Sequence, residues 1–338
     1  MSKCRFSVPD HVVIHSPGGS QGATFAAQAL LNSAASTYSV TLLGRHAFSM
    51  QGYSRVSVAG RSVDTLQLPG GQYRWGLPEG FVGRTVYIDP TYASGLPGTI
   101  ARTAENSHVA YSQNGFPSHL VNKKRRNLVS HTLVSKITTS RSPGAGTVVT
   151  PGGSLLIDEQ DILLPVFHHI FKNQGFFELQ TVPDIRAAQF EKIAINCALN
   201  VSATVSGLSL GELGASARAS RRCADQLEAL VAEVCAVAAA LGVRCARTDD
   251  VVAAMYALVA NNPHHRTSMR RAFEAGGVTE VDVLNGAIVL LGRQCGVATP
   301  VNESMVARLA ALEHAARQRG AGPASVASPV RRAGCPAA

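Results

Sequence analysis

A lysine and two asparagines stand four residues apart in the run EKIAINCALNVSATVSGLSLGEL, at Lys192, Asn196 and Asn200. In an α-helix this spacing puts the amine and the two carboxamides on one face, one turn above the next. The residues between them are apolar, so the three groups form a polar stripe on a helix that is otherwise suited to a core. Buried amides and ammonium groups are costly unless they find partners. A ligand with oxygen atoms would supply such partners; the alternative is a stripe that faces water.

These residue types suit the reduction of a ketone. Hydride transfer to a carbonyl carbon leaves negative charge on the oxygen, and a protonated lysine beside it stabilises that charge and can deliver the proton. A free lysine has a pKa near ~10.4 and therefore starts protonated at neutral pH. Asparagine and serine side chains can bind the hydroxyl and carboxylate oxygens of a substrate with neutral donors. A nicotinamide cofactor would carry the hydride.

A second polar group follows in the C-terminal half of the chain. Thr267-Ser268-Met269 precedes Thr279-Glu280-Val281-Asp282, and an apolar segment comes after it. Taken alone, Glu280 or Asp282 is more typical of an acidic first turn that complements a helix dipole. Glu280 could instead hold the ammonium group of a lysine in place and keep it charged.

The first half of the chain reads as alternating strands and helices, which predicts an α/β unit. Strands are expected at 11–16 and 38–43 on either side of a helix at 23–36, because parallel strands need such a crossover. Further strands are expected at 55–59, 85–88, 108–111, 133–140, 146–149, 154–158 and 176–181, and a helix at 165–174.

A glycine-rich turn lies where the first strand leads into the first helix, the position at which a dinucleotide site places its pyrophosphate. Set against GxGxxG, Gly19 and Gly22 are the second and third glycines, and Pro17 occupies the first position. A proline fixes φ and removes an amide donor, so the phosphate loop is reshaped if it is kept. The second expected strand ends at Arg45, which would suit the 2′-phosphate of NADP.

From Pro183 onward, long Ala/Leu/Val runs predict an all-helical domain. Helices are expected at 186–205, 220–241, 249–260, 278–295 and 302–319, with stop signals at Gly242, Asn261-Asn262-Pro263 and Gly296. We therefore expect domains at 1–183 and 184–319. The Gly-, Pro-, Ser- and Ala-rich tail at 320–338 is expected to be disordered.

The composition suits a soluble globular enzyme, and the pattern of cysteines favours a cytoplasmic one. Among 338 residues, 46% are hydrophobic and 16% charged, and no apolar run reaches the ~20 residues that span a bilayer. No apolar signal core follows Met1–Asp10. The seven cysteines are scattered and lack a CxxC pair, which favours reduced thiols over disulfides or a zinc site, and no metal is expected. Cys197 and Cys235 are expected to be small core residues.

The formal charge of +9 could attract nucleic acid, membranes or small anions. The dense basic cluster, Lys123–Arg126, has no interleaved aromatic residues that could stack on bases. We therefore expect a small-molecule substrate and neither a nucleic-acid nor a membrane partner. Long apolar helices such as 227–241 could support a homodimer.

The run KIAINCALN followed by TEVDVLNGAIVLLGRQCGVATPVN closely resembles the ketopantoate reductase (2-dehydropantoate 2-reductase) family. The Ser268-Met269 pair, the SQNG turn at 112–115 and the strand end VTLLGR at 40–45 are also similar to that family. The resemblance covers roughly residues 11–315, is strong over 185–305 and is patchy over 46–107. It implies a Rossmann-like N-terminal domain, an all-α domain of the 6-phosphogluconate dehydrogenase C-terminal type, and a substrate cleft between them.

By position, the resemblance implies that Lys192 is the catalytic lysine and that Glu280 is a carboxylate that also bears on catalysis. The positions that it assigns to substrate binding are Asn114, Asn196, Asn200 and Ser268. For the binding of NADPH, the resemblance points to the glycine-rich turn and to two further positions. These residues are Gly18, Gly19, Ser20, Gln21, Gly22, Arg45 and Asn114.

Several positions depart from the family pattern. Besides Pro17, the segment Ile88-Asp89-Pro90 stands where the family usually has a lysine, which inverts a charge if Asp89 is the equivalent. In the substrate half, residues that replace the usual tryptophan, proline and aspartate are Phe190, Val201 and Ala272. The substrate half of the motif is thus better kept than the cofactor half.

Three readings follow. The first is an NADPH-dependent reductase of a 2-oxo acid or related ketone, with ketopantoate as the default substrate. The second is a repurposed relative in specialised metabolism, which reduces another carbonyl or catalyses a cofactor-independent isomerisation or cyclisation. The third is a metabolite-binding protein with an inactive site.

Overall fold

The computed structural model describes residues 11–15, 20–33, 38–44, 55–65, 71–75, 85–90, 108–112, 114–116, 129–142, 146–172 and 175–318. The chain divides into two compact units, one of Met1–Gln113 with Lys123–Ile185 and one of Asn114–Asn122 with Arg186–Ala338. The second unit therefore contains a short segment from the half of the sequence that we assign to the N-terminal domain.

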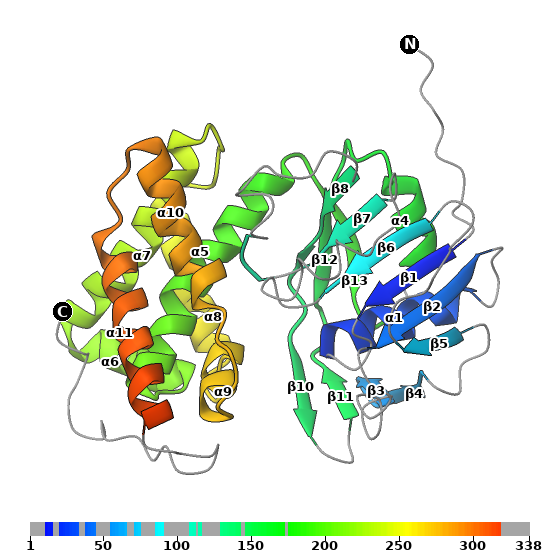
Figure 1. The fold of residues 1–338 in the computed structure, drawn as a ribbon, viewed down its shortest axis with the longest axis horizontal. Helices are drawn as coiled ribbons and strands as arrows, with labels where there is room; N and C mark the ends of the chain where they lie inside the picture. Colours follow the sequence, from blue (N-terminus) through cyan, green and yellow to red (C-terminus); the bar gives the residue numbers. More distant parts are fainter. Residues whose placement is uncertain are drawn as a thin grey trace. The chain divides into compact units, whose positions relative to one another are not determined.

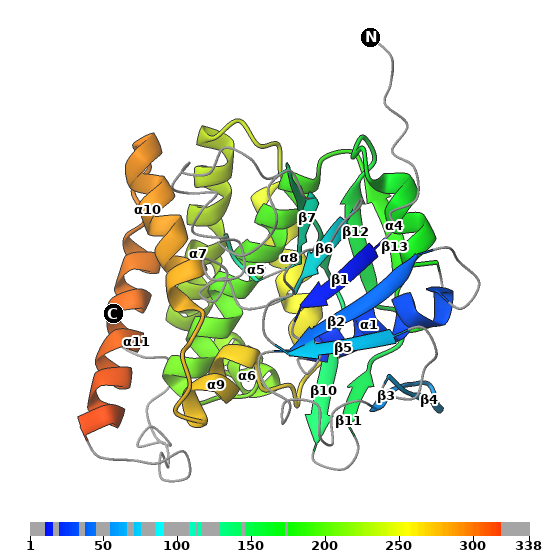
Figure 2. The same ribbon diagram turned by 45° about the vertical axis from the view of Figure 1, so that its right-hand side comes forward.

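A six-stranded parallel sheet forms the centre of the first unit (Figure 1). Its order is β5 (Gly71–Trp75), β2 (Ser39–Gly44), β1 (His11–His15), β6 (Thr85–Asp89), β7 (His108–Tyr111) and β8 (Val129–Thr132). In register, His11 lies opposite Ser39 on β2 and opposite Thr85 on β6. The strand order reverses at β1, as in a Rossmann-like sheet, and ligands of such sheets bind at the carboxyl ends of the strands beside the reversal. Figure 2 shows β1, β2 and β5 side by side.

Helix α1 (Ser20–Ser33) connects β1 to β2 and is buried along almost its whole length. Small residues such as Ala23, Ala26 and Ala27 are fully buried, so neighbouring elements can approach α1 from more than one side. It packs on β1 and β2 and also on β3 (Arg55–Val58), β10 (Thr139–Ser142) and β11 (Gly146–Val149). A helix that is apolar around its circumference is expected to be covered in this way.

Two buried amides of α1 hold the end of α4 (Leu164–Ile170). Gln28 Nε2 donates to the carbonyl oxygens of Phe171 and Phe177, at 3.0 and 3.1 Å. Asn32 Nδ2 donates to the carbonyl oxygens of Ile170 and Lys172, at 2.9 and 3.0 Å. The bonds to Ile170 and Phe171 satisfy carbonyl groups that a helix leaves unpaired at its C-terminus, and the bond to Phe177 ties α1 to the segment before β13.

Two smaller sheets complete the first unit. The four-stranded one has the order β10, β11, β3 and β4 (Arg61–Asp64), and β11 pairs with β3 in parallel. The three-stranded one has the order β13 (Glu178–Val182), β12 (Ser154–Asp158) and β9 (Val134–Ser135).

The second unit is helical. Its core includes the fully buried residues Ala194, Cys197, Ala198 and Val201 of the long helix α5. The helices are α5 (Ile185–Ser206), α6 (Leu210–Ala219), α7 (Arg221–Ala240), α8 (Thr248–Asn261), α9 (Ser268–Glu274), the 3-10 turn η3 (Val281–Val283), α10 (Asn285–Cys295) and α11 (Pro300–Gln318). In the described part of the chain, no single helix is long and apolar enough to cross a membrane, although α5 and α6 together meet that test of length and composition with a bend of 92° between them.

The structure confirms an α/β Rossmann-like region followed by an all-α region, and it corrects several element boundaries. The single strand predicted at 133–140 is wrong, because this stretch holds β9 and the start of β10, with residues 136–138 between them in no strand. The helix predicted at 278–295 is broken at Leu284, whose φ of −104° and ψ of −97° are not helical. Helices α6 and α9 were not predicted. The five cysteines in the described part of the chain are free thiols, and Cys197 is a core residue, as expected.

Candidate active site

The polar stripe of α5 runs from a half-buried end to a buried one. Lys192 and Asn196 are half-buried, whereas Asn200 has only 7% of its surface exposed. The neighbouring residues Ala194, Cys197 and Ala198 are fully buried in the helical core. The stripe is therefore a polar edge of a core helix and not a fully hydrated face.

Glu280 is a buried carboxyl on the short turn that precedes α10. It has 6% of its surface exposed, and its carbonyl oxygen accepts hydrogen bonds from the N–H groups of Val283 and Leu284, at 3.2 and 3.1 Å. The preceding residue, Thr279, donates through its hydroxyl to Glu313 Oε1 on α11 at 2.8 Å. The turn is thus held from α11 on one side and by its own backbone on the other.

The segment 114–116 packs against this turn. Asn114 Nδ2 donates to Glu280 Oε2 at 3.3 Å, and the Phe116 N–H donates to the Val283 carbonyl oxygen at 2.9 Å. The Phe116 ring lies 4.9 Å from that of Phe190 on α5, measured between centroids. Residues more than a hundred positions away in the sequence therefore reach the carboxyl of Glu280 through a side-chain amide.

Gly115 is required between these two contacts. Its φ is +84°, in the region that favours glycine, and a Cβ added there would lie 2.2 Å from the Val283 carbonyl oxygen. The close approach of the two backbones thus depends on the missing side chain. The SQNG motif points to a turn, but nothing in it indicates which element the glycine would touch.

The pKa of Glu280 is set by opposing effects. Burial raises it from its ordinary value of 4.5 to about 7, while the Asn114 hydrogen bond and the positive charge of Lys192 act to lower it. Both protonation states of this carboxyl are therefore populated near neutral pH. The hydrogen bond from Asn114 and the positive charge of Lys192 thus both act on the carboxyl of Glu280.

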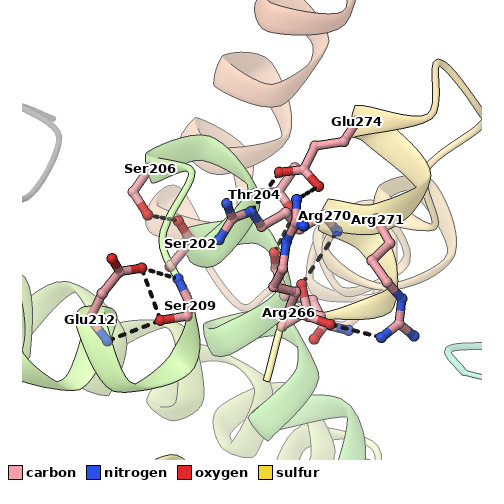
Figure 3. A network of polar contacts seen from close by, with 11 residues as sticks. Ser202, Thr204, Ser206, Ser209, Glu212, Arg266, Arg270, Arg271 and Glu274 are labelled. Carbon is pink, nitrogen blue, oxygen red and sulfur yellow. Dashed lines mark hydrogen bonds and ion pairs between the residues drawn. The ribbon is translucent and has the colours of Figure 1, made fainter. Parts of the chain in front are cut away.

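Ser268 is the half-buried first residue of α9, beside a cluster of charged side chains. Thr267 caps this helix by accepting the Arg270 N–H, and Arg270 Nε donates to Glu274 Oε1 at 2.9 Å. Glu274 also pairs with Arg266, whose carbonyl oxygen accepts a bond from Arg271 (Figure 3). Glu280, by comparison, accepts a hydrogen bond from Asn114 and lies within electrostatic reach of Lys192.

Part of the predicted cofactor turn lies in the first unit. Ser20, Gln21 and Gly22 form the first turn of α1, five residues after the end of β1, and Gly22 is buried. Asp89 is the last residue of β6. The other residues predicted to bind the cofactor, and the proline that replaces the first glycine of the motif, lie outside the described residues: Gly18, Gly19, Arg45 and Pro17. Among the residues that the structure describes, no group of three or more His, Cys, Asp or Glu side chains could hold a metal ion.

The helical region matches the C-terminal part of a known protein family. Residues 184–313 match the family described as "Ketopantoate reductase PanE/ApbA C terminal". The chain is 31% identical over 142 residues to a 2-dehydropantoate 2-reductase of Pyrobaculum aerophilum, a match that covers 41% of this chain and 48% of that protein. The chain thus spans about half the length of the curated relatives it matches.

Solved structures share the fold over a larger part of the chain. A PanE/ApbA family ketopantoate reductase from Ralstonia eutropha JMP134 has a TM-score of 0.74 and 18% identity, covering 91% of this chain and 99% of that one. D-mandelate dehydrogenase, solved with NADH and anilino(oxo)acetate, has the same TM-score, identity and coverage. At this identity the likeness shows the fold alone.

We expect Glu280→Gln to stabilise the protein above neutral pH. The raised pKa means that neutral Glu280 contributes stability below 4.5, which is lost as the pH rises through about 7. Because glutamine stays neutral, the variant should gain on the order of 3 kcal/mol in free energy of unfolding at about pH 8. This gain should vanish below the ordinary pKa of a glutamate. Urea unfolding across pH measures this. The control, Glu303→Gln in an exposed ion pair with Arg293, should change stability by under about 1 kcal/mol.

Gly115→Ala should separate the 114–116 segment from η3. The alanine must adopt a positive φ, and its Cβ meets the Val283 carbonyl oxygen. We therefore expect the free energy of unfolding to fall by about 1–3 kcal/mol and the Phe116 amide to exchange hydrogen faster. The matched control is Gly276→Ala, where φ is +68° but nothing lies within 4 Å of the added Cβ. Equal losses in the two variants would show that the close contact has no energetic role.

Proposed function

We propose that this protein, whose residues 184–313 match the ketopantoate reductase family, is an NADPH-dependent reductase of a 2-oxo acid or related ketone, with ketopantoate as the default substrate. The observation that carries the proposal is the grouping of Lys192, Glu280 and Asn114 in the helical unit. An amine can deliver a proton to a ketone oxygen, and a carboxyl of pKa about 7 with an amide donor can hold that amine and tune it.

In this proposal Lys192 acts on the carbonyl oxygen of the substrate. Its ammonium group stabilises the negative charge that develops there and then supplies the proton. Half-burial of Lys192 favours this role, because charge–charge interactions are stronger where water is partly excluded. The nicotinamide supplies the hydride when it is bound.

Glu280 holds and tunes this lysine. In its ionised form it attracts the ammonium group, and a pKa of about 7 also lets it return a proton to Lys192 after turnover. Asn114 stabilises the ionised form by donating to Oε2. The Glu280 carboxyl is therefore proposed to titrate near neutral pH beside the ammonium group of Lys192.

The amides of the α5 stripe are proposed to bind the rest of the substrate. Asn196 and Asn200 follow Lys192 on the same face of α5, and Asn200 is buried. They and Asn114 offer neutral donors and acceptors for hydroxyl and carboxylate oxygens, without a charge that would compete with Lys192. Ser268, at the start of α9, is proposed as a further hydroxyl ligand.

A nicotinamide cofactor is supported by the Rossmann-like sheet and by the relatives, one of which was solved with NADH. We propose that it binds at the turn Gly18–Gly22 and that Asn114 also contributes. The more specific choice of NADPH rests on Arg45, which would pair with the 2′-phosphate. The relatives favour reduction over a cofactor-independent isomerisation or cyclisation and over an inactive binding protein. A homodimer and a cytoplasmic location stay predictions.

Substitution of the lysine tests the reaction. Lys192→Ala should lower kcat for NADPH oxidation with ketopantoate by about 10²–10⁴-fold, because it removes both the proton donor and the charge at the oxygen. Calorimetric titration should show NADPH binding unchanged. The exposed control, Lys136→Ala, should keep wild-type kcat. A wild-type protein that consumes no NADPH with ketopantoate or a panel of 2-oxo acids would refute the proposed function.

Substitution of the arginine tests the choice of cofactor. Arg45→Ala should raise KM for NADPH about tenfold or more and leave KM for NADH little changed, since only NADPH carries the 2′-phosphate. Arg55→Ala, an exposed arginine on β3, is the control. Parallel changes in both KM values would assign Arg45 a role other than phosphate recognition.

A further inference from the structure

A buried amide joins three helices of the second unit at one point. Asn285, the first residue of α10, has no exposed surface. Its Nδ2 group donates to the carbonyl oxygen of Cys197 on α5 at 3.0 Å and to Asn302 Oδ1 on α11 at 2.9 Å. Both N–H bonds of one carboxamide are thus used to link α5, α10 and α11.

The orientation of this amide is fixed by a carboxylate on α7. Asn302 Nδ2 donates to Glu233 Oε2 at 2.7 Å, which leaves Asn302 Oδ1 as the acceptor that faces Asn285. Glu233 also accepts the N–H groups of Val301 and Asn302, at 2.8 and 2.9 Å, in the first turn of α11. Donation therefore runs in one direction, from Asn285 through Asn302 to Glu233, and it leaves the second N–H of Asn285 for the backbone of α5.

Asn285 links the two elements that carry the proposed proton-transfer pair. Cys197, which receives its hydrogen bond, directly follows Asn196 in the polar stripe. On the other side, Leu284, the residue before Asn285, donates its N–H to the carbonyl oxygen of Glu280 at 3.1 Å. One side chain therefore connects the backbone of α5 to the end of the turn that presents Glu280.

The network is poorly suited to a purely stabilising role. Asn285 Oδ1 is buried and has no hydrogen-bond partner among the described residues. A buried acceptor without a partner costs free energy, and an apolar side chain of similar size would avoid that cost. What an apolar side chain could not do is bind the Cys197 carbonyl oxygen in a fixed direction.

We propose that Asn285 is a positioning residue for the reaction: by tying the Glu280 turn to α5, it sets the separation between the Glu280 carboxyl and the Lys192 ammonium group. The inference rests on the proposed function, because it assigns Asn285 to the proton-transfer pair of that reaction. Asn285 itself acts through the backbone of Cys197 and through the turn and touches no reacting atom.

The groups that face Glu280 indicate the sign of the effect. Lys192 on α5 and Asn114 both lower its pKa, whereas burial raises it. Glu313 on α11 approaches the neighbouring Thr279, and Asp282 on η3 is exposed. If the turn moves away from α5 while it stays buried, the influence of Lys192 weakens and the pKa of Glu280 rises.

The experiment compares Asn285→Ala, Asn285→Ser and the control Ile288→Val in the full-length protein. Ile288 is a fully buried residue of α10, one turn after Asn285, and its apolar side chain takes no part in the amide hydrogen bonds. Carbon-13 NMR of the glutamate carboxyls follows Glu280, assigned by its absence in Glu280→Gln. We expect its titration midpoint to rise by at least ~0.5 pH unit in Asn285→Ala and to stay unchanged in Ile288→Val.

Kinetics give the second readout. In Asn285→Ala the acid-side limb of the kcat/KM profile should move to higher pH with the NMR midpoint, and kcat at neutral pH should fall about tenfold with KM changed less than about twofold. Asn285→Ser, whose hydroxyl can keep one of the two bonds, should show smaller shifts in the same direction, and it carries the test if the alanine variant does not fold.

Two failures are distinguishable. A wild-type protein that reduces no 2-oxo acid would refute the proposed function, yet the NMR titration would still measure whether Asn285 sets the pKa of Glu280. Asn285 variants that lose stability as Ile288→Val does, with the Glu280 midpoint and the pH profile unchanged, would overturn the positioning role.

Discussion

The arrangement of the helical unit depends on one constraint, the burial of a carboxyl group among apolar helices. Glu280 has 6% of its surface exposed, so little water remains to stabilise its ionised form. The unit partly compensates with an amide from Asn114 and the charge of Lys192, and the imbalance leaves the pKa of Glu280 at about 7. A carboxyl in full contact with water would be ionised at neutral pH and could not share a proton with a lysine.

The turn that carries Glu280 is short, so its position depends on bonds to its surroundings. Thr279 bonds to α11, the Val283 carbonyl oxygen accepts from Phe116, and Asn285 binds the backbone of α5. Each of these bonds uses a neutral group of the turn or of Asn285, and each is directional. They can therefore fix the geometry without adding a charge that would compete with Lys192 for Glu280.

The helices of the second unit differ in how well the local sequence predicts them. Long apolar runs with stop signals such as Gly242 predict α5, α7, α8 and α11, because helix periodicity is expressed within each run. Helices α6 and α9 are short and depend on their caps; Ser209 and Glu212 form a capping box that could have revealed α6. The break at Leu284 follows from its backbone conformation, for which this apolar residue type carries no signal.

By itself, the sequence determined the common face of Lys192, Asn196 and Asn200, the α/β and all-α composition of the fold, and the likeness of the helical region to a known family. These are properties of spacing and pattern along the chain. Only the tertiary structure decided that Asn114 meets Glu280 across 166 positions, that Gly115 must lack a side chain, and that Asn285 bonds to α5. Burial, and the pKa that follows from it, depend on how completely distant segments exclude water from one atom, and no local pattern encodes that quantity.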